Sequence, residues 1–171
     1  MTEPKVGANP LFLREEELRQ GIELLFFAYR DFTGEADRIL DELGLGRAHH
    51  RVIYFVGRNP GITVSDLLRI LRITKQSLSR VLTDLMSKGY VVQRQGTTDR
   101  RQRLLELTED GEALERSLSE RQRARLARAY REAGADAVEG FRQVLHGLID
   151  EDKRFQAPDI GRDSTRQGRR S

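Results

Sequence analysis

The chain has 171 residues, of which 33% are charged, with a formal net charge of +3 and no cysteine. This length fits one domain, or one small domain with appended helices. The lack of cysteine excludes a disulfide framework, a thiolate metal site and a thiol-based redox switch.

The N-terminal quarter predicts a polar leader followed by a long helix. Residues 1–10 are polar and contain two prolines and one glycine, so we expect them to be disordered. From 11 to 43, apolar residues recur at intervals of three and four, which is typical of a helix with a broad apolar stripe. Gly21 and Gly34 disfavour an unbroken helix, and Gly44 and Gly46 end it.

Three shorter helices are expected next. The first runs from 47 to 57 and stops at an Asn-Pro-Gly cluster. Thr63 is expected to cap the second, with Asp66 near the acidic position of a capping box. Thr74 is expected to cap the third, which spans 74–88, buries leucines and a valine on one face and ends at Gly89.

The rest of the chain predicts a hairpin and two further helices. Tyr90–Arg94 and Arg103–Leu107 read as strands joined by a long loop through Gly96 and Asp99. A helix capped by Thr108 is expected to reach about Glu132, followed by a corner at Gly134, a last helix from 135 to 152 and a mobile basic tail over 153–171. The fold class is therefore mainly α with a small β hairpin, a winged helix-turn-helix.

Basic charge is concentrated on the winged-helix segment. Residues 47–103 hold 12 basic and only 3 acidic side chains, whereas 1–46 and 104–152 each carry a net charge of −5. Binding of such a segment to a polyanion would release condensed counterions. Given the helix-turn-helix pattern, we favour this interpretation over a solvated basic face without a partner.

Two groups of side chains have the chemistry of DNA recognition. On the helix over 74–88, Gln can bind adenine, Lys and Arg can bind guanine, and Ser and Thr can bind bases or phosphates. This group is Lys75, Gln76, Ser77, Ser79, Arg80 and Thr83. In the wing over 94–103, arginines could enter a minor groove, and Asp99 would hold the loop through a backbone amide or an arginine. The wing group is Arg94, Asp99, Arg100, Arg101 and Arg103.

The combination of residues between Leu45 and Gly111 is specific, although each piece alone is weak. It consists of Thr63, Asp66, Leu67, Ser77, Arg80, Leu85, Gly89, Tyr90, Val91, Asp99, Arg100, Arg101, Leu105, Leu107, Thr108 and Gly111. This stretch resembles the MarR family of bacterial transcriptional regulators. Arg47 occupies a place where many members have proline, and the cysteine of the peroxide-sensing members is missing.

The resemblance implies an organisation for the whole chain. A winged helix over 47–107 would bind double-stranded DNA, and dimerisation helices over 11–46 and 108–152 would interlock into a homodimer. A physical argument also favours the dimer, because a winged helix of about 60 residues cannot cover the apolar stripes of these extensions. The alternative is an antiparallel helical pair that closes on its own monomer.

The resemblance also implies a small aromatic or anionic effector in a crevice between the dimerisation helices and the winged helix. Candidate lining residues are Phe26, Tyr29, Arg30, His49, His50 and Arg51. The two histidines are adjacent on a helix and point about 100° apart, so they cannot face one small ligand equally well. Ordinary structural roles for them are favoured over ligand binding. We expect no metal and no cofactor.

The favoured function is a homodimeric, sequence-specific DNA-binding regulator, expected to be a repressor. The alternative is a winged-helix interaction module that binds protein or RNA. An enzyme is disfavoured, because the chain has no nucleophile elbow, no glycine-rich phosphate loop and no metal-ligand spacing. No apolar run approaches the ~20 residues that cross a bilayer and no secretory signal is visible, so we expect a soluble cytoplasmic protein without a membrane partner.

Overall fold

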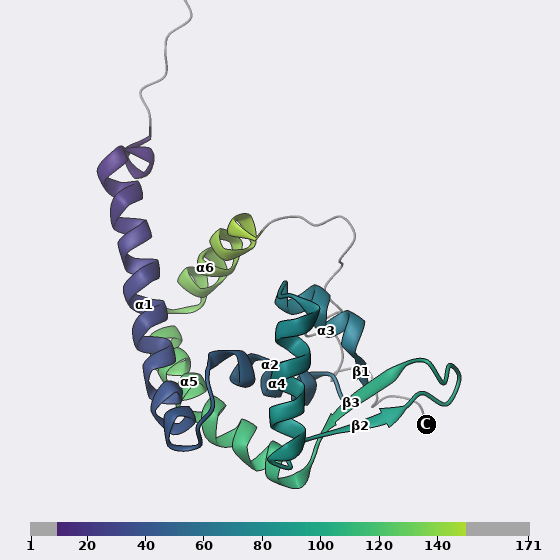
Figure 1. Ribbon diagram of the computed structural model, residues 1–171. Helices are drawn as coiled ribbons and strands as arrows, with labels where there is room; N and C mark the ends of the chain where they lie inside the picture. Colours follow the sequence, from purple (N-terminus) through teal and green to yellow (C-terminus); the bar gives the residue numbers. More distant parts are fainter. Residues whose placement is uncertain (1–9, 150–171) are drawn as a thin grey trace, which may run out of the picture.

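The computed structural model describes residues 10–149 of the chain. Residues 1–9 of the predicted disordered leader lie outside the described residues, as do the predicted end of the last helix over 150–152 and the predicted mobile basic tail over 153–171. A winged-helix lobe occupies one end of the molecule, and long helices extend from it to the other end (Figure 1).

The first long helix is continuous. A 3-10 turn at Leu11–Leu13 precedes α1 (Glu15–Glu42), which runs through both Gly21 and Gly34 without a break. The predicted long helix is therefore confirmed, and the cost of its two glycines, about 1 kcal/mol each, is offset along a helix of 28 residues. Three glutamates in its first turn also stabilise the helix, because their negative charges interact favourably with the helix dipole. Its C-terminal part packs on α5 and buries Ala36 and Leu40.

The predicted helix-turn-helix is confirmed, including its caps. It comprises α2 (Arg47–Arg58), α3 (Val64–Leu71) and α4 (Lys75–Ser87). Thr63 accepts a hydrogen bond from the Asp66 amide at 3.0 Å and so caps α3. The turn between α3 and α4 is made at Arg72, whose φ of 50° lies in the left-handed region.

The expected hairpin is part of a three-stranded antiparallel sheet. Its strands are β1 (Ile62–Thr63), β2 (Val91–Gln95) and β3 (Arg103–Leu107), in the order β1-β3-β2. Leu105 lies at the centre, opposite Ile62 on one side and Gln93 on the other. The sequence did not indicate β1, because two residues are too few to show an alternating pattern.

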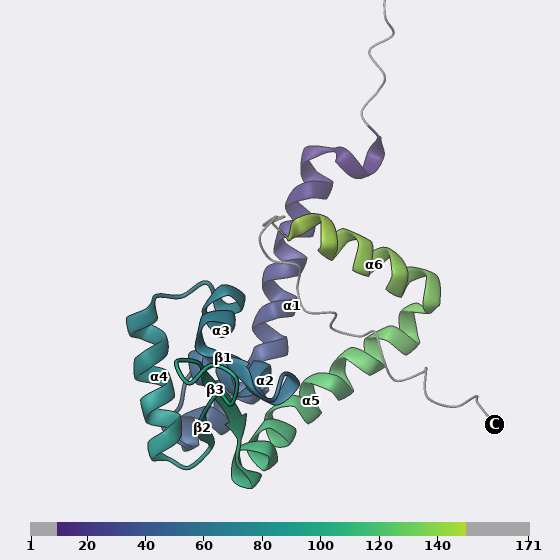
Figure 2. The same ribbon diagram turned by 90° about the vertical axis from the view of Figure 1, so that its right-hand side faces the viewer.

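Two helices complete the described chain. Thr108 caps α5 (Glu109–Ala133) through the Gly111 amide at 3.0 Å, and Gly134, with φ of 86°, makes the corner to α6 (Ala135–Leu148). The last helix ends earlier than predicted, because Ile149 is already extended. Figure 2 shows α6 turning back from the far end of α5 toward α1.

The hydrophobic core lies almost wholly in the lobe and at its junction with α1 and α5. It contains Leu40, Ile53, Leu67, Leu78, Leu85, Leu105 and Leu118, which are essentially inaccessible to solvent. This core fixes α4 against α2 and the sheet, so the polar face of α4 is displayed on a rigid support. Across residues 10–149, no helix has both the length and the apolar character that spanning a bilayer requires.

Candidate nucleic-acid interface

The start of α4 is held by its own first turn. Thr74 accepts a hydrogen bond from the Ser77 amide at 3.1 Å, and its hydroxyl donates to the Ser77 Oγ at 2.9 Å. Ser77, one of the predicted DNA contacts, thus has one of its acceptor positions occupied by the cap. The amino-terminal turn of α4 is thereby ordered before any ligand is present.

The opposite faces of α4 have different chemistry. Leu78, Val81, Leu82 and Leu85 are buried in the core, whereas the predicted recognition residues are all exposed. The Thr83 hydroxyl donates to the Ser79 carbonyl at 2.8 Å, which leaves its oxygen free to accept and its methyl group exposed. Within residues 10–149, no carboxylate lies within ion-pair distance of Lys75 or Arg80.

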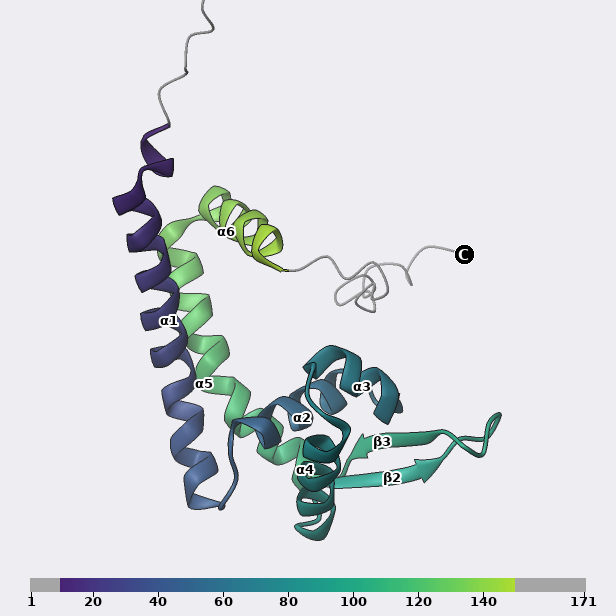
Figure 3. The same ribbon diagram turned by 45° about the horizontal axis from the view of Figure 1, so that its top comes forward.

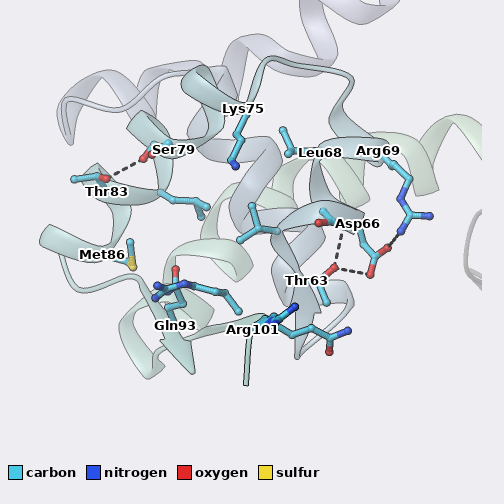
Figure 4. A pocket seen from close by; sticks show the side chains of 15 residues that line it. Thr63, Asp66, Leu68, Arg69, Lys75, Ser79, Thr83, Met86, Gln93 and Arg101 are labelled. Carbon is cyan, nitrogen blue, oxygen red and sulfur yellow. Dashed lines mark hydrogen bonds and ion pairs between the residues drawn. The ribbon is translucent and has the colours of Figure 1, made fainter. Parts of the chain in front are cut away.

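The structure brings α4 and the wing to one surface. A groove of about 720 Å³ lies between α3, α4 and the hairpin (Figure 4). Lys75, Ser79 and Thr83 line it from α4, and Arg101 and Arg103 line it from the wing. Residues that are 18 or more positions apart in sequence therefore offer hydrogen-bond donors and positive charge to the same groove.

The wing loop is tied by short-range hydrogen bonds. Asp99 accepts from the Arg101 amide at 2.9 Å, which confirms one of the two roles expected for it. Gly96 donates to the Gln102 carbonyl at 2.9 Å, and a Cβ at this position would lie 2.5 Å from the Asp99 carbonyl oxygen. The loop consequently needs glycine here, and Arg100 and Arg101 in this loop are exposed. Figure 3 shows the loop between β2 and β3 projecting away from the lobe.

The arginines of the wing are not equivalent. Arg94 pairs with Glu106 across the hairpin at 3.1 Å. Arg100, Arg101 and Arg103 have no such carboxylate partner among the described residues. Arg94 must therefore give up or share an intramolecular contact in order to bind a phosphate, whereas the other three need not.

Several residues of the groove were missed by sequence reasoning. Met86, Gln93 and Gln102 line it, and Asp66 lies there in an ion pair with Arg69. Met86, Gln93 and Gln102 have no local signal, because each reaches the groove through the packing of its element, and Asp66 was expected only as part of a helix cap. A further contact, between His49 on α2 and Asp84 on α4, joins atoms Nε2 and Oδ2 at 2.9 Å. Asp84 did carry a signal, since acidic residues are rare in this basic segment.

The structure brings together only some of the predicted effector-binding residues. Tyr29 on α1 accepts a hydrogen bond from Arg51 on α2 at 3.0 Å. Arg30 instead pairs with its neighbour Asp31 and lies over the Phe27 ring. Phe26 is 64% exposed on the amino-terminal half of α1. The effector crevice stays a prediction.

The two histidines point to different places, as their helical spacing indicated. His49 faces α4, whereas His50 lies half-buried near Asp37 of α1 and Glu115 of α5. Burial lowers the pKa of His50, which outweighs the opposing influence of the two carboxylates. At neutral pH this imidazole is accordingly uncharged.

The junction of α1 and α2 contains a charged pair that sequence reasoning did not find. Arg47, the first residue of α2, donates to both carboxylate oxygens of Asp37, with a shortest distance of 2.7 Å. This hydrogen bonding lowers the pKa of Asp37 and raises that of Arg47. Arg47 also lies 5.7 Å from the centre of the Tyr29 ring. No cluster of three or more possible metal ligands occurs in residues 10–149.

Comparisons with known proteins agree with this geometry. A sequence model described as "MarR family" matches residues 43–102. The chain is 56% identical over 144 residues to the HTH-type transcriptional regulator PetP of Rhodobacter capsulatus, covering 84% of this chain and 87% of that protein.

Solved structures share the fold. Streptococcus pneumoniae FabT in complex with DNA has a TM-score of 0.68 and 19% identity, covering 77% of this chain and 94% of that one. A mutant of Escherichia coli MarR complexed with operator DNA has a TM-score of 0.59 and 23% identity, covering 83% of this chain and 100% of that one.

Proposed function

The chain belongs to the MarR family of helix-turn-helix transcriptional regulators, and we propose that it acts as a homodimer that binds duplex DNA in a sequence-specific way. Its family and its relative indicate a regulator and not an enzyme.

The groove between α4 and the wing is the main support for DNA binding. Lys75, Arg101 and Arg103 line it without a carboxylate partner among the described residues. These neighbouring cations without internal partners raise the electrostatic free energy of the groove, because like charges repel. Bound phosphates would lower it. The groove is therefore suited to a polyanion and not to a neutral protein surface.

The three parts of this surface would have different tasks. Lys75, Arg100 and Arg103 would contact phosphates and supply affinity, which falls with salt. Gln76 and Arg80 would read base edges, because their amide and guanidinium groups can form two hydrogen bonds to one base. Arg101 at the wing tip would respond to the width of a minor groove.

The dimer is supported by apolar surface that one copy leaves in water. No residue of α1 before Thr33 is buried, and none of α6 is buried. Ile22 and Phe26 on α1 are 68% and 64% exposed, and Val144 on α6 is 63% exposed. Such a large apolar surface on a single chain is typical of an interface. Within residues 10–149, the alternative, closure on the same monomer, is limited to the packing of the end of α1 on α5 and of α5 on α6.

Charge complementarity indicates that a second copy covers this surface. The first half of α1 is acidic, with Glu15, Glu16, Glu17 and Glu23. The second half of α5 has an exposed basic set, Arg121, Arg123, Arg128 and Arg131. Opposite charges on two helices of the same chain favour a two-fold arrangement in which α1 of one copy lies against α5 of the other. Two copies of α4 would then read a roughly palindromic site.

Repression is the proposed outcome, since a dimer that covers a stretch of DNA denies it to other proteins.

We propose that an effector binds at the junction of α1 and α2, where Arg47 and Arg51 provide positive charge beside the Tyr29 ring. A small aromatic carboxylate could compete there for the guanidinium groups. Titration of the DNA complex with benzoate tests this, and DNA release that is lost in Arg51→Gln is the expected result; no release would contradict it.

The salt dependence of binding tests DNA recognition. Binding sites are first mapped by protection on fragments upstream of the gene, and affinity is then measured by fluorescence anisotropy over a range of salt concentrations. Counterion release predicts a slope of several units in log affinity per log salt. A flat response would favour a protein-binding module, and preference for a folded RNA over the duplex would favour an RNA-binding one.

Arg80→Ala tests base reading. We expect a loss of roughly 1 to 3 kcal/mol in binding to the mapped site, the scale of one bidentate base contact, with the dimer intact. Arg142→Ala is the matched control, because Arg142 is exposed on α6, away from the groove. Normal affinity of Arg80→Ala for the mapped site would remove this residue from the proposed function.

A further inference from the structure

A carboxylate on a DNA-binding helix requires an explanation. Asp84 is the one acidic residue of α4, and it follows Arg80 by four positions. Side chains at this spacing are neighbours on a helix surface, so Arg80 and Asp84 could form an ion pair. Such a pair would occupy the guanidinium group that the proposed function assigns to a base.

His49 holds this carboxylate. Its Nε2 lies 2.9 Å from the Asp84 Oδ2, while its Nδ1 accepts a hydrogen bond from the Gly46 amide at 3.0 Å. An imidazole that accepts at Nδ1 and donates at Nε2 is neutral, and both contacts are then satisfied together. The ring thus connects the amino terminus of α2 to the last turn of α4.

His49, Arg80 and Asp84 face one hollow. They line a space of about 620 Å³ together with Val81, Thr83 and Ser87. Arg80 has no ion pair within residues 10–149, although Asp84 is near it in this hollow. Lys88 follows Asp84 by four positions as well, but it is not among the residues that line the hollow.

We propose that His49 is a positioning residue for DNA recognition: by binding Asp84 it keeps this carboxylate from pairing with Arg80, whose guanidinium group stays available for DNA. The inference rests on the proposed function of Arg80. It also explains why a half-buried histidine and an acidic residue occur together beside the recognition surface.

A double-mutant cycle separates this role from a structural one. His49→Gln is the first variant, because glutamine at the third helical position can still accept from the Gly46 amide while the bond to Asp84 is lost. Asp84→Asn removes the competing charge. The double variant carries both changes, and His146→Gln on the exposed α6 is the matched control. Melting temperatures are measured for all, and His49→Asn replaces His49→Gln if the latter unfolds.

The expected pattern is a loss that the second substitution rescues. His49→Gln should weaken binding to the mapped site by about 3- to 10-fold, which lies in the lower part of the range of coupling between contacting residues. Asp84→Asn should keep the affinity, and the double variant should match Asp84→Asn. If the His49–Asp84 contact only braced α4, Asp84→Asn would weaken binding as much as His49→Gln and no rescue would occur. That result, or unchanged binding by His49→Gln, would overturn the proposal.

Arg80→Ala is measured in the same series. If it leaves binding unchanged, the role of Arg80 in the proposed function is wrong. If it weakens binding while His49→Gln does not, only the positioning role of His49 is wrong. The two failures are therefore distinguishable.

Discussion

The lobe around α4 and the helices that extend from it use the same kind of apolar pattern in opposite ways. Leu78, Leu82 and Leu85 recur at threes and fours on α4 and are buried by their own chain. Leu18, Ile22 and Leu25 recur in the same way on α1 and are at least 45% exposed. Helical periodicity therefore predicts that one face of a helix is buried, but it does not show whether the same chain or another molecule covers that face.

The two regions are joined at a tight contact between α5 and the start of β2. Thr108 donates to the Gly89 carbonyl at 2.6 Å, and its amide donates to the Tyr90 carbonyl at 3.1 Å. Gly111, in the first turn of α5, lies directly against the Tyr90 backbone. Long helices can therefore extend from the lobe in a defined direction.

The largest expected effect is on this contact. A Cβ at Gly111 would lie 2.0 Å from the Tyr90 carbonyl oxygen, so Gly111→Ala must displace backbone. We expect a loss of roughly 3 kcal/mol or more in the free energy of unfolding, measured by urea denaturation. Gly140→Ala on α6 is the control, because a Cβ there meets nothing within 4 Å. Equal stability of the two variants would contradict the contact.

The next effect concerns the helical extension alone. Ile22→Asp places a charge in the proposed interface, and we expect the dimer to dissociate about 100-fold more readily while the lobe stays folded. Sedimentation and circular dichroism measure the two properties separately. Gln20→Asp, about 200° away around the same helix, should leave the dimer unchanged. A dimer that tolerates Ile22→Asp would refute the assignment of this face.

A smaller effect is expected at the wing, which belongs to the lobe. Arg101→Ala should weaken DNA binding across sequences and reduce the salt slope by about 1, because a cation inserted in the minor groove also displaces condensed counterions. Arg94→Ala should reduce the slope less, because Arg94 already pairs with Glu106. The salt titration described above measures both. If the two variants behave alike, the distinction between free and paired wing arginines fails.

The smallest effect is expected at His50 of α2, which lies near Asp37 of α1 and Glu115 of α5. The pKa of His50 is lowered from 6.5 by burial, so the unfolded chain binds its proton more readily than the folded one. The contribution of the neutral imidazole to the free energy of unfolding is fully present above pH 6.5, and it decreases as the pH falls below that value. His50→Gln should remove this part of the pH dependence, as measured by urea denaturation at several pH values. A dependence identical to that of the unmodified protein would exclude His50, and His146→Gln serves as control.

Local signals were enough for much of the candidate interface. Thr63, Thr74 and Thr108 cap their helices as predicted, because a cap needs only residues within one turn. The polar face of α4 followed from periodicity. The pair of Arg47 with Asp37 could not be predicted in this way, since it joins two helices across a turn through side-chain geometry.

The sequence by itself determined the order of the helices, their caps, the wing and the location of basic charge, because these depend on neighbours along the chain. Only the tertiary structure decided that Ile62 pairs with Leu105, that Arg101 shares a groove with Lys75 and that His49 binds Asp84. Such contacts depend on how helices and strands pack together, and packing is set by the whole core and not by any local segment.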